Sequence, residues 1–209
     1  MENKVELIGV YGDDLSPAAA AWYSTSNTLT DDKLKRVPAL LKTLAGNDDE
    51  PPHSVVFEHT LIQFRVISDV ATHIHFLKHR VGVSISSQSA RWKENNKDEW
   101  YTPDDWPKSV KDSYDTMVRA ALIAYHAYIR RLEEAGMSRQ RAKESARFIL
   151  PYGTQMTYLV TFNFLSFIHF QNLRNSDKAQ QEVRKLAADM LRLVRETHRF
   201  DRSLEAWGW

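Results

Sequence analysis

The sequence predicts a mixed fold, either α+β or α/β, in a single domain that spans residues 1–209. Gly and Pro number only 7 each, so residues that break helices are few. Apolar residues recur at helical spacing over several long stretches, and short segments rich in β-branched and aromatic residues lie between them. This pattern is typical of helices interspersed with strands. The best linker candidate, residues 46–52, is short enough to be a loop inside one domain.

The first half of the chain predicts two strands and three helices. Residues 5–10 are an apolar strand candidate, and residues 55–67, rich in Val, Phe and Ile, are another. Short polar side chains before the helical stretches can accept hydrogen bonds from free backbone N–H groups. The expected N-caps of the three helices are Ser16, Thr30 and Asp69. We expect the third helix to run to about His79.

The second half predicts one strand and four helices. Residues spaced three or four apart form an apolar stripe on a long helix that Gly136 ends. The stripe consists of Val110, Tyr114, Met117, Ala121, Tyr125, Tyr128 and Leu132. Ser138 is expected to cap the next helix, and residues 155–162 to form a strand that leads into a helix ending near Arg174. Ser176 is expected to cap the last long helix, whose inward residues are Ala179, Val183, Leu186, Met190 and Val194.

Composition excludes several classes of protein. The chain has no cysteine, which rules out a disulfide scaffold, a Cys-ligated metal site and a thiol nucleophile. The formal net charge is +1, so no global field attracts nucleic acid or an anionic membrane. The sequence contains no apolar run long enough to span a bilayer and begins without the apolar core of a signal peptide. We therefore expect a cytoplasmic protein with neither nucleic-acid nor membrane partners.

Histidines are concentrated in one stretch of the chain. Five of the eight lie between His53 and His79, and His75 and His79 are four residues apart, which on one helix would place them on the same face. Such spacing can ligate a metal, but no HExxH pattern accompanies it. The alternative is a set of histidines that hydrogen-bond, cap helices or contact a ligand. We favour this second interpretation and expect no metal site.

Residues 78–92 combine cations with small hydroxyl side chains. Lys78-His79-Arg80 precedes a loop that contains four serines and ends in Ser89-x-Arg91. Serine hydroxyls and arginine forks bind phosphate, so this composition suits a phosphate-bearing ligand. A solvated loop beside a helix-terminal charge cluster would explain it equally well. Arg147 and Arg174, each beside an aromatic segment, would suit a flat anionic ligand.

Together these segments resemble the flavin-dependent thymidylate synthases over almost the whole chain. The resemblance is carried by Gly12-Asp13-Asp14-Leu15, Phe57-Glu58-His59, Lys78-His79-Arg80 with the later Ser89-x-Arg91, Arg147-x-x-Leu150-Pro151, and Asn172-Leu173-Arg174. It implies an α+β domain with a central, mostly antiparallel sheet wrapped by long helices, assembled as a homotetramer with shared active sites. It also implies synthesis of dTMP from dUMP, with methylenetetrahydrofolate as carbon donor, FAD as redox cofactor and NADPH as reductant.

The resemblance also implies roles for individual residues. Those expected to contact FAD are His53, Glu58, Lys78, His79, Arg80, Asn163 and His169. Those expected to bind dUMP are His75, Gln88, Ser89, Arg91, Arg147 and Arg174. Arg174 would read the uracil edge and act in catalysis, because a cation there stabilises negative charge that builds on the ring.

The sequence departs from the family pattern mainly in residues 78–92. We call this the signature segment, because it carries Lys78-His79-Arg80 and Ser89-x-Arg91. Lys78 replaces an arginine, and eight residues instead of seven separate Arg80 from Ser89. Ser86-Ser87 stands in place of an Asn-Glu pair, so a carboxylate is missing. The other departures are Trp92 for tyrosine, Leu165 for arginine and His169 for asparagine.

Three further functions stay open, and the departures motivate the first of them. A relative with this fold could hydroxymethylate dUMP or alkylate a related pyrimidine nucleotide. A helical, metal-dependent nucleotide phosphohydrolase could be built on His75 and His79. A non-catalytic relative could bind the nucleotide without turning it over.

Overall fold

The computed structural model describes residues 1–24, 29–47, 50–89 and 99–209. The chain divides into two compact units, and each is described by itself. The first unit contains the described residues of Met1–Lys4, Ile67–Phe76 and Ser86–Tyr158. The second contains those of Val5–Val66, Leu77–Ile85 and Leu159–Trp209. The prediction of a single domain over residues 1–209 therefore stays a prediction.

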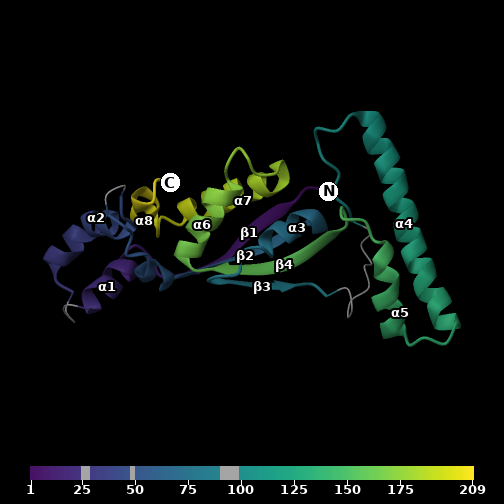
Figure 1. Cartoon of the computed structure of the whole chain (residues 1–209), viewed down its shortest axis with the longest axis horizontal. Helices are drawn as coiled ribbons and strands as arrows, with labels where there is room; N and C mark the ends of the chain where they lie inside the picture. The colour runs from purple at the N-terminus through teal and green to yellow at the C-terminus, as the bar shows by residue number, and fades with distance from the viewer. Residues whose placement is uncertain (25–28, 48–49, 90–98) are drawn as a thin grey trace. The chain divides into compact units, whose positions relative to one another are not determined.

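Four strands form one sheet in the order β1-β2-β4-β3 (Figure 1). Within the second unit, Gln63 Nε2 donates to Thr161 Oγ1 at 3.0 Å. Within the first, the hydroxyls of Ser68 and Tyr158 lie 3.1 Å apart. Residue numbers rise along β2 while they fall along β4, so these strands are antiparallel. The bounds are Lys4–Tyr11 for β1, Leu61–Asp69 for β2, Val83–Ser87 for β3 and Gln155–Phe162 for β4.

Strand β3 occupies a segment that composition alone presented as a loop. The backbone N–H of Gln88 donates to Thr157 O at 2.9 Å, and that of Asn163 donates to Gly82 O at 3.0 Å. These two pairs show that β3 runs antiparallel to β4. The expected α+β class with an antiparallel sheet is therefore confirmed. Serine is a weak strand former, which explains why residue composition did not reveal this strand.

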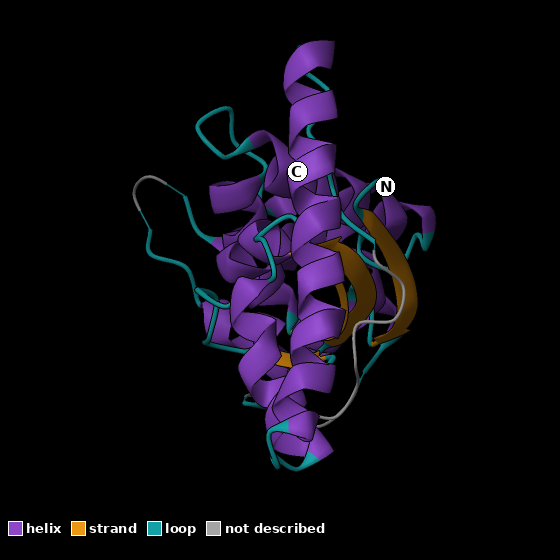
Figure 2. Cartoon of the chain, turned by 90° about the vertical axis from the view of Figure 1, so that its right-hand side faces the viewer, coloured by secondary structure: helices purple, strands orange, loops and turns teal. Residues whose placement is uncertain are grey.

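The helices of the first unit are α3, α4 and α5, with bounds Val70–Phe76, Lys108–Glu134 and Arg139–Ala146. Helices α4 and α5 lie side by side as a hairpin (Figures 1 and 2). Buried Tyr125 and Ile129 of α4 pack with buried Ala142 and Ala146 of α5, because small residues on one helix let the other approach closely.

The buried stripe of α4 differs from the predicted one. Its buried residues are Val118, Leu122, Tyr125 and Ile129, and only Tyr125 belongs to the predicted stripe. Val110, Met117 and Tyr128 remain 46%, 49% and 43% exposed. The two stripes lie roughly 70° apart around the helix, at 100° per residue, and the buried stripe packs against α5. The periodicity therefore located the helix correctly but not the side that packs within the chain.

The helices of the second unit are α1, α2, α6, α7 and α8, with bounds Leu15–Tyr23, Asp31–Ala45, Phe164–Arg174, Gln181–Glu196 and Asp201–Ala206. Its core contains a group of aromatic rings that pack against one another. Phe64 stacks on Phe167 at 5.9 Å, and Phe162 lies 5.2 Å from Phe170. All four side chains are fully buried, so α6 is anchored firmly on this part of the sheet.

Three predicted helix caps are confirmed. Thr30 Oγ1 accepts from Lys33 N, and Ser138 Oγ accepts from Arg141 N. Asp69 Oδ1 accepts from the backbone N–H of Thr72 at 2.7 Å. Pro38 lies inside α2 without ending it.

Three other local predictions are wrong. Helix α1 begins at Leu15, so Ser16 is not its cap, and α7 begins at Gln181, well after Ser176. Residues 54–58 form a short 3₁₀ helix before β2 begins, although their β-branched composition predicted strand. Phe57 in that turn is fully buried, and tertiary packing of this kind overrides local strand propensity.

Among the described residues, no helix is both long enough and apolar enough to cross a membrane.

Candidate active site

In the second unit, the segment after Lys78 is held against the N-terminus of α6. Asn163 caps that helix, since its Oδ1 accepts from Ser166 N at 2.8 Å. Ser166 Oγ in turn donates to Val81 O at 2.7 Å. Gly82 has a φ of 61°, and a Cβ there would lie 2.3 Å from Ser166 Oγ and 2.4 Å from Asn163 Nδ2. Only glycine fits this contact, so Gly82 fixes how closely the segment approaches the helix.

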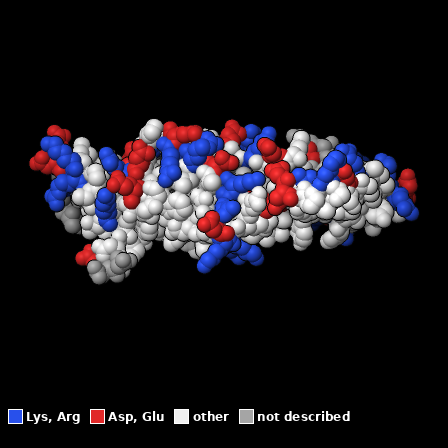
Figure 3. All heavy atoms as spheres, turned by 90° about the horizontal axis from the view of Figure 1, so that it is seen from above, with Lys and Arg blue, Asp and Glu red and all other residues white. Residues whose placement is uncertain are grey.

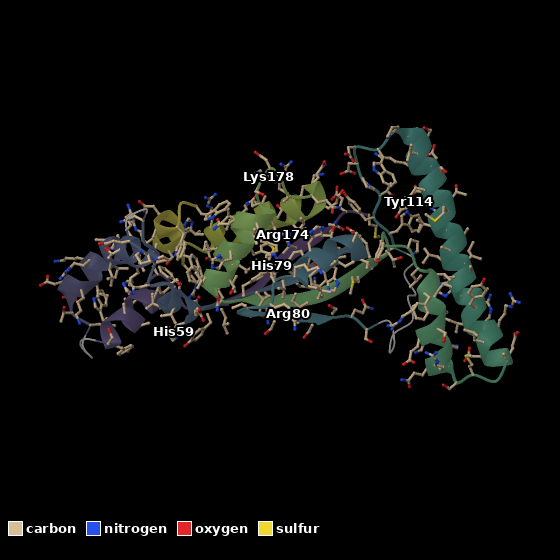
Figure 4. The ribbon with its side chains drawn as sticks, in the orientation of Figure 1. His59, His79, Arg80, Tyr114, Arg174 and Lys178 are labelled. Carbon is tan, nitrogen blue, oxygen red and sulfur yellow. The ribbon has the colours of Figure 1, made fainter. Side chains whose placement is uncertain are left out.

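The same segment is held at the other end of α6 by a polar contact. Arg174, the last residue of α6, donates from Nε to His79 Nε2 at 3.0 Å, and Figure 4 shows the two side chains next to one another. The imidazole of His79 also packs edge-on against Phe170 at 5.0 Å. The contacts at both ends of the helix hold His79 and Arg174 in a defined geometry.

The remaining residues predicted to contact FAD lie on the surface of the second unit. Lys78, Arg80 and His169 are exposed, as are His53 and Glu58 at the two ends of the 3₁₀ helix. Asn163, by contrast, is only 8% exposed. Its side-chain oxygen caps α6, so the structure assigns it a structural contact that the motif comparison did not anticipate.

In the first unit, the predicted phosphate-binding residues lie on three separate segments. His75 is half-buried on α3, Gln88 and Ser89 follow the end of β3, and exposed Arg147 follows α5. Arg91 and Trp92 lie outside the described residues. Expectations for those two positions stay predictions.

The first unit contains a histidine contact that was not predicted. His73 Nε2 lies 2.8 Å from Ser87 Oγ, and the His73 ring packs against Tyr158 at 4.5 Å. Burial lowers the pKa of His73, because a charged imidazole loses hydration there. The contact joins α3 to the end of β3, where the family pattern has its missing carboxylate. Period-2 alternation over residues 83–87 is the signal that could have indicated it.

The proposed metal pair of His75 and His79 is not supported. Helix α3 ends at Phe76, so His79 lies beyond it and the two histidines share no helix face. Within the described residues, no group of three or more His, Asp or Glu side chains is arranged to hold a metal ion.

Charges of both signs are interspersed on the face that Figure 3 draws. This agrees with a net charge of +1 and with the absence of a global field of one sign.

The sequence model of the family described as "Thymidylate synthase complementing protein" matches residues 6–198. The chain belongs to this family. Curated relatives named flavin-dependent thymidylate synthase include one from Thermosipho melanesiensis, 28% identical over 92% of this chain and 85% of that protein. Another, from Geobacter sulfurreducens, is 34% identical over 68% of this chain and 60% of that protein.

A solved structure of similar fold is the UMP/dUMP methylase PolB from Streptomyces cacaoi, bound with 5-Br dUMP. The two chains are 25% identical, the match covers 99% of this chain and 95% of that chain, and the TM-score is 0.74. The predicted membership in the flavin-dependent thymidylate synthase family and the predicted enzyme class are therefore confirmed: this is a pyrimidine-methylating enzyme.

Proposed function

We propose that this chain catalyses reductive methylation of dUMP to dTMP, with methylenetetrahydrofolate as carbon donor, FAD as cofactor and NADPH as reductant. One observation carries the proposal. In a chain whose residues 6–198 match the family, Arg174 lies 3.0 Å from His79 of the signature segment. A guanidinium that lies beside an imidazole suits a planar anionic ligand. Contacts at both ends of α6 hold these two groups in place.

The donor set of the second unit fits FAD. Lys78 and Arg80 are exposed cations on one segment, next to His79, and cations with N–H donors suit the diphosphate of a dinucleotide. The close approach at Gly82 holds this segment against α6. We infer that Lys78, His79 and Arg80 hold FAD with His53, Glu58 and His169, and that Asn163 fixes the segment. FAD, when bound, supplies the reducing equivalents.

Arg174 would hold the uracil ring. Its Nε is bonded to His79, and no other hydrogen bond of Arg174 occurs among the described residues, which leaves the terminal amino groups for ligand oxygens. A fixed cation there stabilises negative charge on the pyrimidine during carbon transfer. Because the chain has no cysteine, the ring is not activated by thiolate attack.

We propose that the phosphate of dUMP is bound by His75, Gln88, Ser89, Arg91 and Arg147. Arginine forks and hydroxyls are the side chains that phosphate monoesters prefer. The family match runs through both units, and we propose that residues 1–209 work as one catalytic domain.

A homotetramer would explain the exposed apolar stripe of α4. Val110, Met117 and Tyr128 form part of it and remain about half exposed in the single chain. Apolar stripes of this kind are usually covered in the assembled protein. We propose that further copies of this chain cover it.

A second candidate function is methylation of UMP in addition to, or in place of, dUMP. It is favoured by the solved neighbour, which is described as a UMP/dUMP methylase. Hydroxymethylation is the other outcome that the altered segment around Ser86 and Ser87 suggests, since the usual carboxylate is missing there.

Turnover with purified protein, FAD, NADPH and methylenetetrahydrofolate tests the proposal, with dUMP and UMP supplied in parallel. We expect flavin to be bound and dTMP to form from dUMP. Selective formation of the UMP product would favour the second candidate. A protein that takes up no FAD and forms neither product would overturn both.

A further inference from the structure

Residues 199–209 lie beyond the part of the chain that the family model matches. They form α8 and its flanks within the second unit, and they contact three of the motifs that identify the family. Figure 1 shows α8 close to α2 and to the chain's C-terminal residue. These contacts give the segment a role that the family match does not assign.

The first contact is at the start of α8. Asp14 accepts hydrogen bonds from the backbone N–H groups of Arg202 and Ser203, at 2.9 and 2.7 Å. The backbone N–H of Asp14 donates to Arg199 O at 2.9 Å. A carboxylate at a helix N-terminus satisfies free N–H groups and complements the helix dipole, so Asp14 of the Gly-Asp-Asp motif fixes where α8 begins.

The second contact is at the end of α8. The Trp207 ring lies edge-on to Phe57 at 5.5 Å, and Phe57 stacks on Phe164, the first residue of α6, at 5.9 Å. Phe57 is fully buried, while its neighbour Glu58 is exposed. The ring contacts therefore set how the Phe-Glu-His turn presents its polar residues.

The third contact is made by the last residue. Trp209 Nε1 donates to Asn172 Oδ1 at 3.0 Å, and Trp209 N donates to Leu204 O at 2.9 Å. Gly208, with a φ of 80°, allows the chain to turn back. Asn172 lies in the final turn of α6, two residues before Arg174, and helix ends fray unless they are tied down.

We propose that residues 199–209 are a brace that positions Arg174 and the Phe57-Glu58-His59 turn for the reaction. The inference rests on the proposed function. Trp209 acts through Asn172 and Trp207 acts through Phe57, so both are positioning residues that need not touch the ligands. Asp14 holds the brace at its other end, which turns three short contacts into one rigid support.

A double-mutant cycle on Trp209 and Asn172 in the full chain tests the brace. Trp209→Phe keeps an aromatic ring but removes the donor, and we expect about a fivefold fall in kcat/KM for dUMP, the effect of one neutral hydrogen bond. Asn172→Ala should cause a similar fall, and the double variant should be no worse than either single one. Asn172→Asp, which keeps the acceptor oxygen, should retain the turnover that Asn172→Ala loses.

Three further variants extend the test, and two of them, Trp207→Phe and Trp106→Phe, are controls. Trp207→Phe should have little effect, because Trp207 Nε1 has no hydrogen-bond partner among the described residues, whereas Trp207→Ala should weaken FAD binding. Trp106→Phe, in the first unit, should leave the FAD dissociation constant and the kcat/KM for dUMP unchanged. The FAD dissociation constant, the kcat and KM for dUMP, and the thermal midpoint are measured for every variant.

The possible results separate the brace from the proposed function. Full activity of Trp209→Phe, or additive losses in the double variant, would overturn the brace while the function stands. A lower thermal midpoint with unchanged kcat/KM would also overturn it, since the segment would then be merely structural. An unaltered chain that shows no turnover would overturn the proposed function, and the brace with it.

Discussion

Arg174 Nε and His79 Nε2 are joined by a hydrogen bond of 3.0 Å, although 95 residues separate them in the chain. The guanidinium is a donor only, so the imidazole nitrogen must carry a lone pair. The bond orients Arg174 through Nε alone and leaves its terminal nitrogens for a ligand. The chemistry proposed for this protein depends on that orientation.

Replacing Arg174 tests the role of its charge directly. Arg174→Ala should lower kcat/KM for dUMP about tenfold to a hundredfold, because a charge-assisted contact with the substrate is lost. The free energy of unfolding should change little. Arg184→Ala is the matched control, since Arg184 forms an exposed ion pair with Asp177. Equal activity of the two variants would show that the role assigned to Arg174 is wrong.

Replacing Gly82 tests the close approach to α6. Gly82→Ala introduces a Cβ 2.3 Å from Ser166 Oγ at a φ of 61° and should lower the free energy of unfolding by at least about 2 kcal/mol. Gly136→Ala is the matched control, because its φ is 91° but nothing lies within 4 Å. It should cost only about 1 kcal/mol. Urea unfolding measures both, and equal costs would contradict the steric account.

Burial of His73 predicts a pH dependence of stability. Its pKa is lowered in the folded protein, so the unfolded chain takes up the proton first as pH falls below about 6.5. The free energy of unfolding should therefore decrease with falling pH in that range. His73→Gln should flatten this slope, as measured by urea unfolding between about pH 7.5 and pH 5.

A matched control for His73 is the exposed His59. His59→Gln should leave the pH slope of the unaltered chain in place. A steep slope that persists in His73→Gln would assign the pH dependence to other groups.

The exposed stripe of α4 predicts dependence on assembly. Met117→Glu places a charge in that stripe and should dissociate the proposed tetramer, since a buried unpaired charge is costly. Arg130→Glu, on the opposite side of α4, should leave the assembly intact. Size-exclusion chromatography with light scattering measures the mass of each. A monomer in the unaltered chain would rule out the homotetramer.

Local sequence patterns predicted individual elements well. Strand β4 has the predicted bounds, Gln155–Phe162, and α4 was located by its periodicity and by Gly136. Thr30, Asp69 and Ser138 were recognised as caps because capping depends only on neighbouring residues. The family motifs gave the α+β class and the enzyme class.

Long-range relationships were not predictable in the same way. The packing side of α4 depends on α5, the burial of Phe57 on α6 and Trp207, and the His79 contact on Arg174. Each requires two segments that are distant in sequence to meet, and periodicity or composition contains no information about such pairs. The strand at residues 83–87 was missed because its hydroxyl side chains favour loops.

The central claim is tested most directly by mass spectrometry of the nucleotide formed from dUMP in the presence of FAD, NADPH and methylenetetrahydrofolate. The account predicts a product heavier than dUMP by one CH2 group, with the chromatographic behaviour of dTMP. A product heavier by one CH2O group, or unchanged dUMP with a flavin-loaded protein, would contradict it.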